Sequence, residues 1–441
     1  MRNYLKGAIA LAVICFSCFG ASAQSLQDTL PHSVTLREAV EYAIKRQPAI
    51  LQSLADEQIT EAGIKSRLAD WYPQINFNYN LQHNFVLPTT IVQGNPQRFG
   101  VDNTSAVQFA LSQVVFNRDA LLANRTRNDV RLQSRQMTAS SKIETEAAVS
   151  KAFYDALASS QQVKVSDENI ARIERSLKDA YNQYQAGIAD KTDYKRANIA
   201  LNNARALKKT NEEFLKAKMA YLKSLMGYPG GERLEIAYDS LQMEKEILLD
   251  TLQQADYTKR IEFKLLETQQ RLLEANLKYM RWGYLPSVSL NGAYNFNYQQ
   301  NDLSKLYNAN YPNSFAAIAL SVPLFQGGKR KANIESAQWQ LQKNRLDIVG
   351  LQNAVSAGYT GALAAYKSEL ANYESIKENL ALAMEVYNII QLQYKSGVKT
   401  YLEVINSETD LRTAQINYYN SLYNLLSSKI DVQKALGQIN Y

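Results

Sequence analysis

Two stretches of sequence decide the fold, YPQINFNYNLQHNF at 72–85 and LPSVSLNGAYNFNY at 285–298. In both, apolar residues alternate with polar ones after a proline, and this two-residue period is typical of a strand with one apolar and one polar face. Two further stretches, 105–116 and 314–325, show a noisier alternation. We therefore predict four β-strands, which span 74–85, 105–116, 287–298 and 314–325.

The four predicted strands contain no Asp, Glu, Lys or Arg, although 21% of the chain is charged. A random chain would leave so many positions uncharged about once in a hundred thousand trials. A tilted strand needs about 9–11 residues to cross a bilayer, and each predicted strand is long enough. Aromatic residues lie at the strand ends, as in the girdles of outer-membrane barrels: Trp71, Tyr72, Phe116, Trp282, Tyr284 and Phe325. The pattern favours membrane strands, and the alternative is a soluble sandwich of two hairpins.

The chain contains an internal duplication. The tetrapeptide YQAG at 184–187 corresponds to YKSG at 394–397, and Gly227 corresponds to Gly437, both at an offset of 210 residues. Because several such markers keep their order and spacing, a tandem repeat is the economical explanation. The predicted units are a first repeat at 24–230, a linker at 231–258 and a second repeat at 259–441.

Long stretches without proline predict long helices. Proline is absent from 117–228 and from 324–441, and glycine is rare in both. Apolar residues from Ile348 to Tyr387 recur 11 times over 39 residues, a mean spacing of 3.55. This spacing lies between a straight helix and a heptad seam, so the helices should coil around their neighbours. The predicted helices span 117–186, 188–228, 326–396 and 398–437.

Residues 1–23 are typical of a secretory signal peptide, because two basic residues precede a short apolar run and a small-x-small site. Both cysteines of the chain, Cys15 and Cys18, fall inside this segment, and the residues around Cys18 do not favour lipidation. Removal of Arg2 and Lys6 with the leader would lower the formal charge from +7 to +5. We expect an exported protein.

The residues that remain after the leader argue against an enzyme. They include no cysteine and only two histidines, His32 and His83, which excludes thiolate and disulfide chemistry and disfavours a histidine-based centre. We expect no catalytic site, no cofactor and no metal. Basic residues beyond the strand ends, such as 329–331, are better explained as a solvated helix face than as a nucleic-acid site. No stretch after the leader is long and apolar enough for a membrane helix.

Four strands are too few to close a membrane barrel. An open edge in hydrocarbon leaves backbone groups without partners, and bacterial barrels begin at about eight strands. Further copies of the chain should therefore complete the barrel, with cyclic symmetry. The long helices would extend the barrel on one side of the membrane, with turns at Gly187 and Gly397 at the far tip.

In these features the chain resembles the TolC-type outer membrane efflux proteins. The resemblance covers nearly the whole chain after the leader, and the order of its motifs makes it specific. The motifs are TLREAV at 35–40, GYLP at 283–286, SVPLFQGG at 321–328, YKSG at 394–397 and YLEVIN at 401–406.

The resemblance implies a homotrimer with a 12-stranded barrel in the outer membrane, a coiled helical tunnel in the periplasm and an equatorial belt that includes the linker. It implies the outer membrane channel of a tripartite efflux pump or a type I secretion system, which exports small molecules or proteins with porin activity. The implied partners are a periplasmic adaptor (membrane fusion protein), an inner-membrane transporter and outer membrane lipid. The alternative is a soluble periplasmic coiled-coil adaptor or scaffold.

The resemblance also implies a gate at the periplasmic tip. Glu403 and Asn406 correspond to lumen-facing positions that are often both acidic in the family. The contacts that close the tip correspond to Thr192, Asp193, Tyr394 and Lys399. Because Glu403 and Asp193 each lie at a helix start, where carboxylates are favoured, a structural role is an equal alternative for both. The predicted junctions between helix and strand are Pro73, Pro286 and Pro323.

Overall fold

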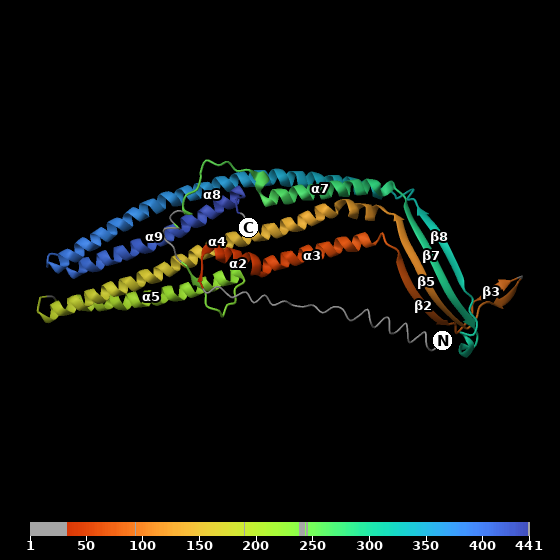
Figure 1. Ribbon diagram of the computed structural model, residues 1–441, viewed down its shortest axis with the longest axis horizontal. Helices are drawn as coiled ribbons and strands as arrows, with labels where there is room; N and C mark the ends of the chain where they lie inside the picture. The colour runs from red at the N-terminus through yellow and green to blue at the C-terminus, as the bar shows by residue number, and fades with distance from the viewer. Residues whose placement is uncertain (1–32, 93, 189, 238–242, 244–245, 440–441) are drawn as a thin grey trace.

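The computed structural model describes residues 33–92, 94–188, 190–237, 243 and 246–439. The predicted leader lies outside these residues. The described chain is elongated, with two helical hairpins at one end and a bent four-stranded sheet at the other (Figure 1). Among the described residues, no helix is both long and apolar enough to cross a membrane.

The sheet is antiparallel and has the order β2-β5-β7-β8. Its middle pair, β5 with β7, joins the two repeats. A bulge between Val114 and Phe116 interrupts the ladder of β5, and β8 ends at Ser321, before the predicted boundary, because the nearby Pro323 has no N–H for a ladder. The strands are β2 (Gln74–His83), β5 (Asn103–Phe116), β7 (Ser287–Gln300) and β8 (Asn313–Ser321).

The helices repeat one plan in each half of the chain: a helix leads into a strand hairpin, and two long antiparallel helices follow it. Figure 1 shows the resulting hairpins α4/α5 and α8/α9 reaching the same end of the molecule. The prediction of long helices, four strands and an internal duplication is confirmed. The helices are α2 (Leu36–Arg46), α3 (Pro48–Ala69), α4 (Arg118–Gln185), α5 (Lys191–Met226), α7 (Ile261–Arg281), α8 (Lys329–Lys395) and α9 (Tyr401–Leu436).

The two repeated glycines end equivalent helices. Gly227 follows α5 with φ 67°, and Gly437 follows α9 with φ 68°, so both are left-handed caps that glycine adopts without strain. At Gly227 the backbone of Arg46 also approaches closely, because a Cβ there would lie 2.7 Å from the Arg46 carbonyl oxygen.

The main core lies midway along the molecule, where α2, α4, α5, α8 and α9 meet. Apolar residues of three helices form its centre, for example Phe153, Met226 and Leu425. The described part of the linker is fastened to this core, because the Tyr366 hydroxyl donates to the carbonyl oxygen of Ile247 at 2.8 Å.

Several small elements were not predicted. A short hairpin projects beyond the outer end of the sheet (Figure 1), in the segment between the first two predicted strands. A two-residue parallel pair joins the start of the described chain to the linker. These elements are β1 (Ser33–Val34), β3 (Thr89–Val92), β4 (Asn95–Arg98), β6 (Glu235–Ile236) and the 3-10 helices η1 (Tyr257–Lys259), η2 (Trp282–Tyr284) and η3 (Leu303–Lys305).

Candidate functional site

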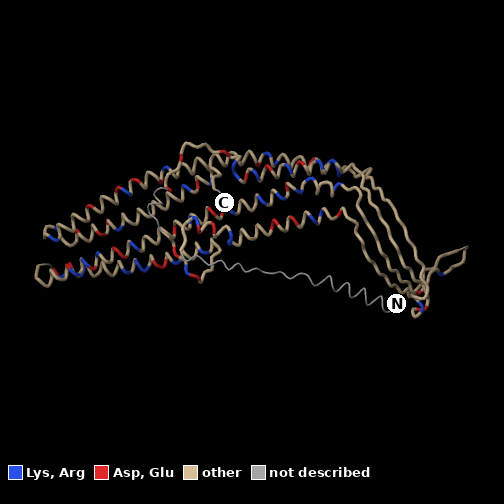
Figure 2. Tube along the Cα trace, viewed as in Figure 1, with Lys and Arg blue, Asp and Glu red and all other residues tan. Residues whose placement is uncertain are grey.

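The sheet has one apolar and one amide-rich face. The ladder places Phe77 opposite Phe109, and Phe109 opposite Tyr294, so apolar rows run across the strands. The neighbouring row joins Asn78, Gln108 and Asn295 on the other face. Figure 2 shows these strands without acidic or basic residues, whereas the helices carry both along their length. This is the arrangement of a sheet with lipid on one side and water on the other.

Both edge strands of the sheet are exposed along their whole length. Every residue of β2 and of β8 is exposed, and each of these strands pairs on one side only within the protomer. Large apolar side chains lie on both edges, for example Phe77 at 61% and Ile318 at 76% exposure. Such an apolar open edge is stable only when another strand covers it.

The three predicted proline junctions lie where the sheet meets the helices. Pro73 precedes β2, Pro286 precedes β7, and Pro323 follows β8. Arginines stack on aromatic rings in this region, which sequence reasoning had treated only as a solvated basic face. The pairs, with distances from guanidinium carbon to ring centroid, are Arg118 on Tyr279 (4.7 Å), Arg125 on Trp282 (4.8 Å) and Arg330 on Tyr284 (4.0 Å).

At the tip of the first hairpin, Thr192 lies in the first turn of α5. Asp190 caps this helix, because its Oδ1 accepts hydrogen bonds from the Thr192 backbone N–H at 2.7 Å and hydroxyl at 2.9 Å. These bonds hold the pKa of Asp190 below its usual range. Asp193 lies in the first turn of α5. Sequence reasoning missed Asp190, although an Asp two residues before a Thr at a helix start is a recognisable capping signal.

At the tip of the second hairpin, the side chain of Glu403 forms hydrogen bonds with nearby residues at the start of α9. Its Oε1 accepts a hydrogen bond from the Lys399 Nζ at 2.6 Å, and its Oε2 accepts one from the Thr400 N–H at 2.9 Å. With Thr400 it forms a capping box at the start of α9. The bond from Lys399, followed by that from Thr400, lowers the pKa of Glu403, so its carboxylate stays ionised. Asn406 is exposed on the same helix.

Tyr394 connects the two hairpins at the tip. Its hydroxyl donates to Oε1 of Gln183 on α4 at 3.1 Å, and its ring lies 5.8 Å from that of Tyr401. Both rings are buried with Ala197 of α5 and Val404 of α9. Burial raises the pKa of both tyrosines, and the charge of Asp193 adds to this effect. The structure thus places Asp193 near the small core that contains Tyr394, and Gln183 is a contact that sequence reasoning missed.

A ladder of polar contacts continues along α4 and α9 from the equator to the tip. The contacts are spaced along both helices, so they fix how the two hairpins lie against each other. No repeat or motif in the sequence indicated them. In order from the equator to the tip they are Lys434–Glu144 at 2.7 Å, Lys151–Asp431 at 2.6 Å, Gln162–Asn420 at 2.7 Å, Arg172–Gln415 at 3.4 Å and Ser176–Glu408 at 3.1 Å. We call this ladder the α4–α9 seam.

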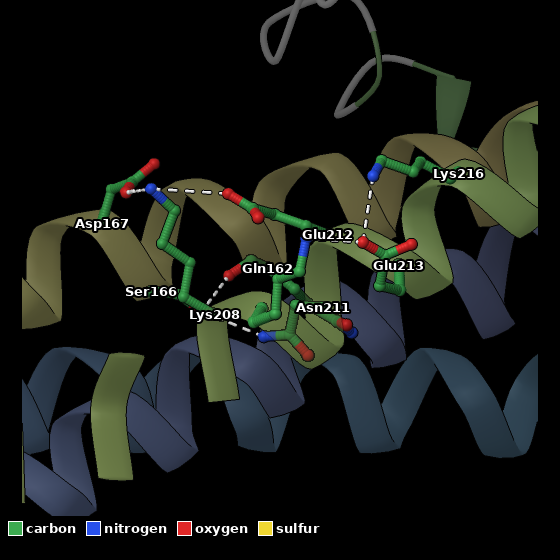
Figure 3. Close-up of polar contacts among 9 residues, drawn as sticks. Gln162, Ser166, Asp167, Lys208, Asn211, Glu212, Glu213 and Lys216 are labelled. Atoms are coloured by element: carbon green, nitrogen blue, oxygen red, sulfur yellow. Dashed lines mark hydrogen bonds and ion pairs between the residues drawn. The ribbon is translucent and has the colours of Figure 1, made fainter. Parts of the chain in front are cut away.

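A second polar ladder lies inside the first hairpin, between α4 and α5. Figure 3 shows its middle, where the Lys208 Nζ of α5 lies 2.6 Å from Oδ1 of Asp167 on α4 and 3.5 Å from Oε1 of Glu212. Asn211 donates to the Ser166 hydroxyl at 2.9 Å. Further pairs at either side are Arg205–Glu174 at 2.8 Å and Lys218–Asp155 at 2.8 Å.

In the part of the chain that the structure describes, no three His, Cys, Asp or Glu side chains are grouped so that they could hold a metal ion. The main features of the described residues are an apolar sheet face, two open sheet edges and a tip held by contacts between helices.

Comparison with known proteins agrees with this architecture. The family model of the outer membrane efflux protein matches residues 39–228 and 259–438. The outer membrane protein TolC of Vibrio cholerae is 21% identical over 427 residues, which cover 92% of this chain and 91% of that protein.

Two solved structures are similar in fold. The transmembrane channel protein CusC has a TM-score of 0.72 at 18% identity, with 91% of each chain covered. The open state of the MtrE outer membrane channel of Neisseria gonorrhoeae has a TM-score of 0.69 at 17% identity, with 91% of this chain and 88% of that chain covered. The comparisons do not support the alternative of a soluble adaptor. The predicted resemblance is confirmed: the chain belongs to the outer membrane efflux protein family and is an efflux channel of the outer membrane.

Proposed function

We propose that three copies of the chain close one 12-stranded barrel, four strands from each copy, and continue it as a helical tunnel through the periplasm. The observation that carries this proposal is the pair of exposed sheet edges. Because β8 runs antiparallel to β2, β8 of one copy and β2 of the next can extend the same antiparallel ladder. Each closed edge would remove unpaired backbone groups from lipid.

In this assembly the channel is the exit duct of a tripartite efflux pump or a type I secretion system. A periplasmic adaptor joins the tunnel to an inner-membrane transporter, which supplies both substrate and energy. The chain itself carries out no chemical reaction, and its part is a gated passage.

The gate of this passage is the helical tip. We assign the closing contacts to Thr192, Asp193, Tyr394 and Lys399, and the lumen-facing positions to Glu403 and Asn406. The charge of Asp193 acts on Tyr394 and Tyr401 across the tip, and this proximity supports the assignment. Replacement of Asp193 by Ala should loosen the closed tip and raise the single-channel conductance in planar bilayers. An unchanged conductance would contradict the role of Asp193.

Adjacent residues of β2 provide a matched test of the barrel. Phe77 lies on the apolar face and Asn78 on the amide-rich face. A lysine in hydrocarbon costs about 2–4 kcal/mol, whereas a lysine in an aqueous lumen is tolerated. Phe77→Lys should therefore abolish the trimer in outer membrane fractions, whereas Asn78→Lys should assemble and shift ion selectivity in planar bilayers. Equal recovery of both variants as trimers would rule out this placement of the sheet.

A further inference from the structure

Glu408 is a carboxylate buried inside the α4–α9 seam. It is 3% exposed on α9, and the Ser176 hydroxyl of α4, itself 2% exposed, donates to its Oε1 at 3.1 Å. Other acids of the seam are different, since the side chain of Asp431 is 48% exposed. Glu408 is buried within a single protomer, so its environment does not depend on the contacts between copies.

The titratable groups around Glu408 come from three helices. Arg172 and Arg175 approach from α4, Tyr387 from α8, and Tyr401 from one end of α9. Burial raises the pKa of Glu408, and the Ser176 hydroxyl and the two arginines offset part of this rise.

Arg172 is close to Glu408 but has only weak contacts of its own. Its side chain is 12% exposed, it donates to Oε1 of Gln415 at 3.4 Å, its nearest carboxylate is that of Glu168 at 3.8 Å, and its guanidinium carbon lies 5.9 Å from the Tyr387 ring. Its Nε has no hydrogen-bond partner among the described residues. The seam therefore contains a buried acid and a buried base that are near each other without a direct ion pair.

We propose that Glu408 and Ser176 form a proton-controlled latch between the two hairpins, which favours the closed tip when the carboxyl is neutral and favours separation of α4 from α9 when it is ionised. The proposal rests on the tip being the gate of the channel. A neutral carboxyl keeps its hydrogen bond to Ser176 at little desolvation cost, whereas an ionised one without a direct partner is costly to bury.

Opening of the seam would lower this cost in two ways. Water would reach the ionised carboxylate, and Arg172 would become available to pair with it. Arg172 and Ser176 are four residues apart and share a face of α4, so the guanidinium lies about one turn from the hydroxyl that Glu408 binds.

The test is the conductance of the full-length channel in planar bilayers between about pH 5 and pH 8. The open fraction of the unmodified channel should rise about threefold or more with pH, because deprotonation opens the seam. Glu408→Gln keeps the shape and the hydrogen bond but cannot ionise, so its open fraction should stay at the low-pH value throughout. Asp410→Asn is the matched control, because Asp410 is exposed on the same helix and its loss should leave the pH response intact.

A second variant distinguishes a latch from a structural contact. Ser176→Ala removes the hydroxyl that Glu408 binds in the closed seam, so the open fraction should exceed that of the unmodified channel at each pH while the response to pH remains, whereas Glu408→Gln abolishes that response. A pH response that survives in Glu408→Gln, or an unmodified channel without one, would overturn the latch and leave the channel function standing. Failure of the unmodified protein to form pores at any pH would instead overturn the proposed function.

Discussion

The hairpins α4/α5 and α8/α9 come from one duplicated sequence but are stabilised differently. Helix α4 lies in the middle of the protomer, between α2, α3, α5, α7 and α9, and many of its buried residues are small, such as Ala156 and Ser159. Helix α8 packs mainly on α9 and α7, and it contributes large aromatic residues such as Tyr366 and Tyr373 to the core.

The contacts between the two helices of each hairpin also differ. Ion pairs connect α5 to α4, and the rings of Tyr181 and Tyr194 meet near the tip of this hairpin, whereas tyrosine rings between α8 and α9 lie at the core, for example Tyr373 and Tyr418 at 5.7 Å. Much of α8 is left exposed with apolar residues on its surface, such as Trp339 at 67% and Leu392 at 68%. A duplicated element has thus diverged into one helix that is covered within the chain and one whose surface is available to other copies.

The largest effect is expected at the aromatic core of the second hairpin. Tyr401 is 1% exposed, so Tyr401→Ala should destabilise the α8/α9 tip by about 3–5 kcal/mol. Leu402→Ala is the control, because Leu402 is 46% exposed. Hydrogen exchange of α9 near the tip should become much faster in the first variant only. Similar exchange in both variants would show that aromatic packing does not hold this hairpin.

The repeated glycines sharpen the comparison further. Alanine at either Gly227 or Gly437 would adopt a left-handed conformation at a cost of about 1–2 kcal/mol. At Gly227 the Cβ would also lie 2.7 Å from the Arg46 carbonyl oxygen, whereas at Gly437 the nearest atom would be 3.3 Å away. Gly227→Ala should therefore lower the melting temperature more than Gly437→Ala. The reverse order would mean that the end of α2 moves easily.

The sequence predicted the elements better than the contacts between them. The strands were predictable because alternation and the exclusion of charge follow from having lipid on one side. The β3–β4 hairpin was missed, because its strands are short, exposed and interrupted by Pro96. The buried position of Glu408 was also missed, because the sequence around a single acid in a long helix does not show whether its side chain is buried or exposed. Only the pairing of α4 with α9 shows that it is covered.

A smaller effect concerns a half-buried acid of the first repeat that has no acidic counterpart in the second. Burial raises the pKa of Glu146 on α4 to about 7, and its Oε2 has no hydrogen-bond partner among the described residues. The folded state therefore binds a proton more tightly than the unfolded state, so stability should fall as pH rises from about 5 towards 8. Because the group is partly solvated, the loss should be about 1 kcal/mol.

Glu146→Gln should remove this loss, so its melting temperature should exceed that of the unmodified protein at pH 8 and equal it near pH 5. Glu144→Gln is a suitable comparison, because Glu144 is exposed two residues away and pairs with Lys434, and its replacement should bring no gain at pH 8. A melting temperature of Glu146→Gln that follows the unmodified protein at both pH values would show that Glu146 is ionised in the folded state.

The smallest effect is expected in the α4–α5 ladder. The Lys208 side chain is 32% exposed and that of its partner Asp167 is 53% exposed, so the pair should contribute little to stability and be screened by salt. Raising the salt concentration from about 0.1 M to 1 M should therefore speed hydrogen exchange in α5 more than in α8, whose contacts with α9 include aromatic rings. In Lys208→Met, which keeps the apolar stem, the response of α5 near this site should weaken. An equal response of α5 and α8 to salt would mean that apolar packing, and not the ion pairs, holds both hairpins, and the difference between the repeats would then lie in the size of their buried side chains alone.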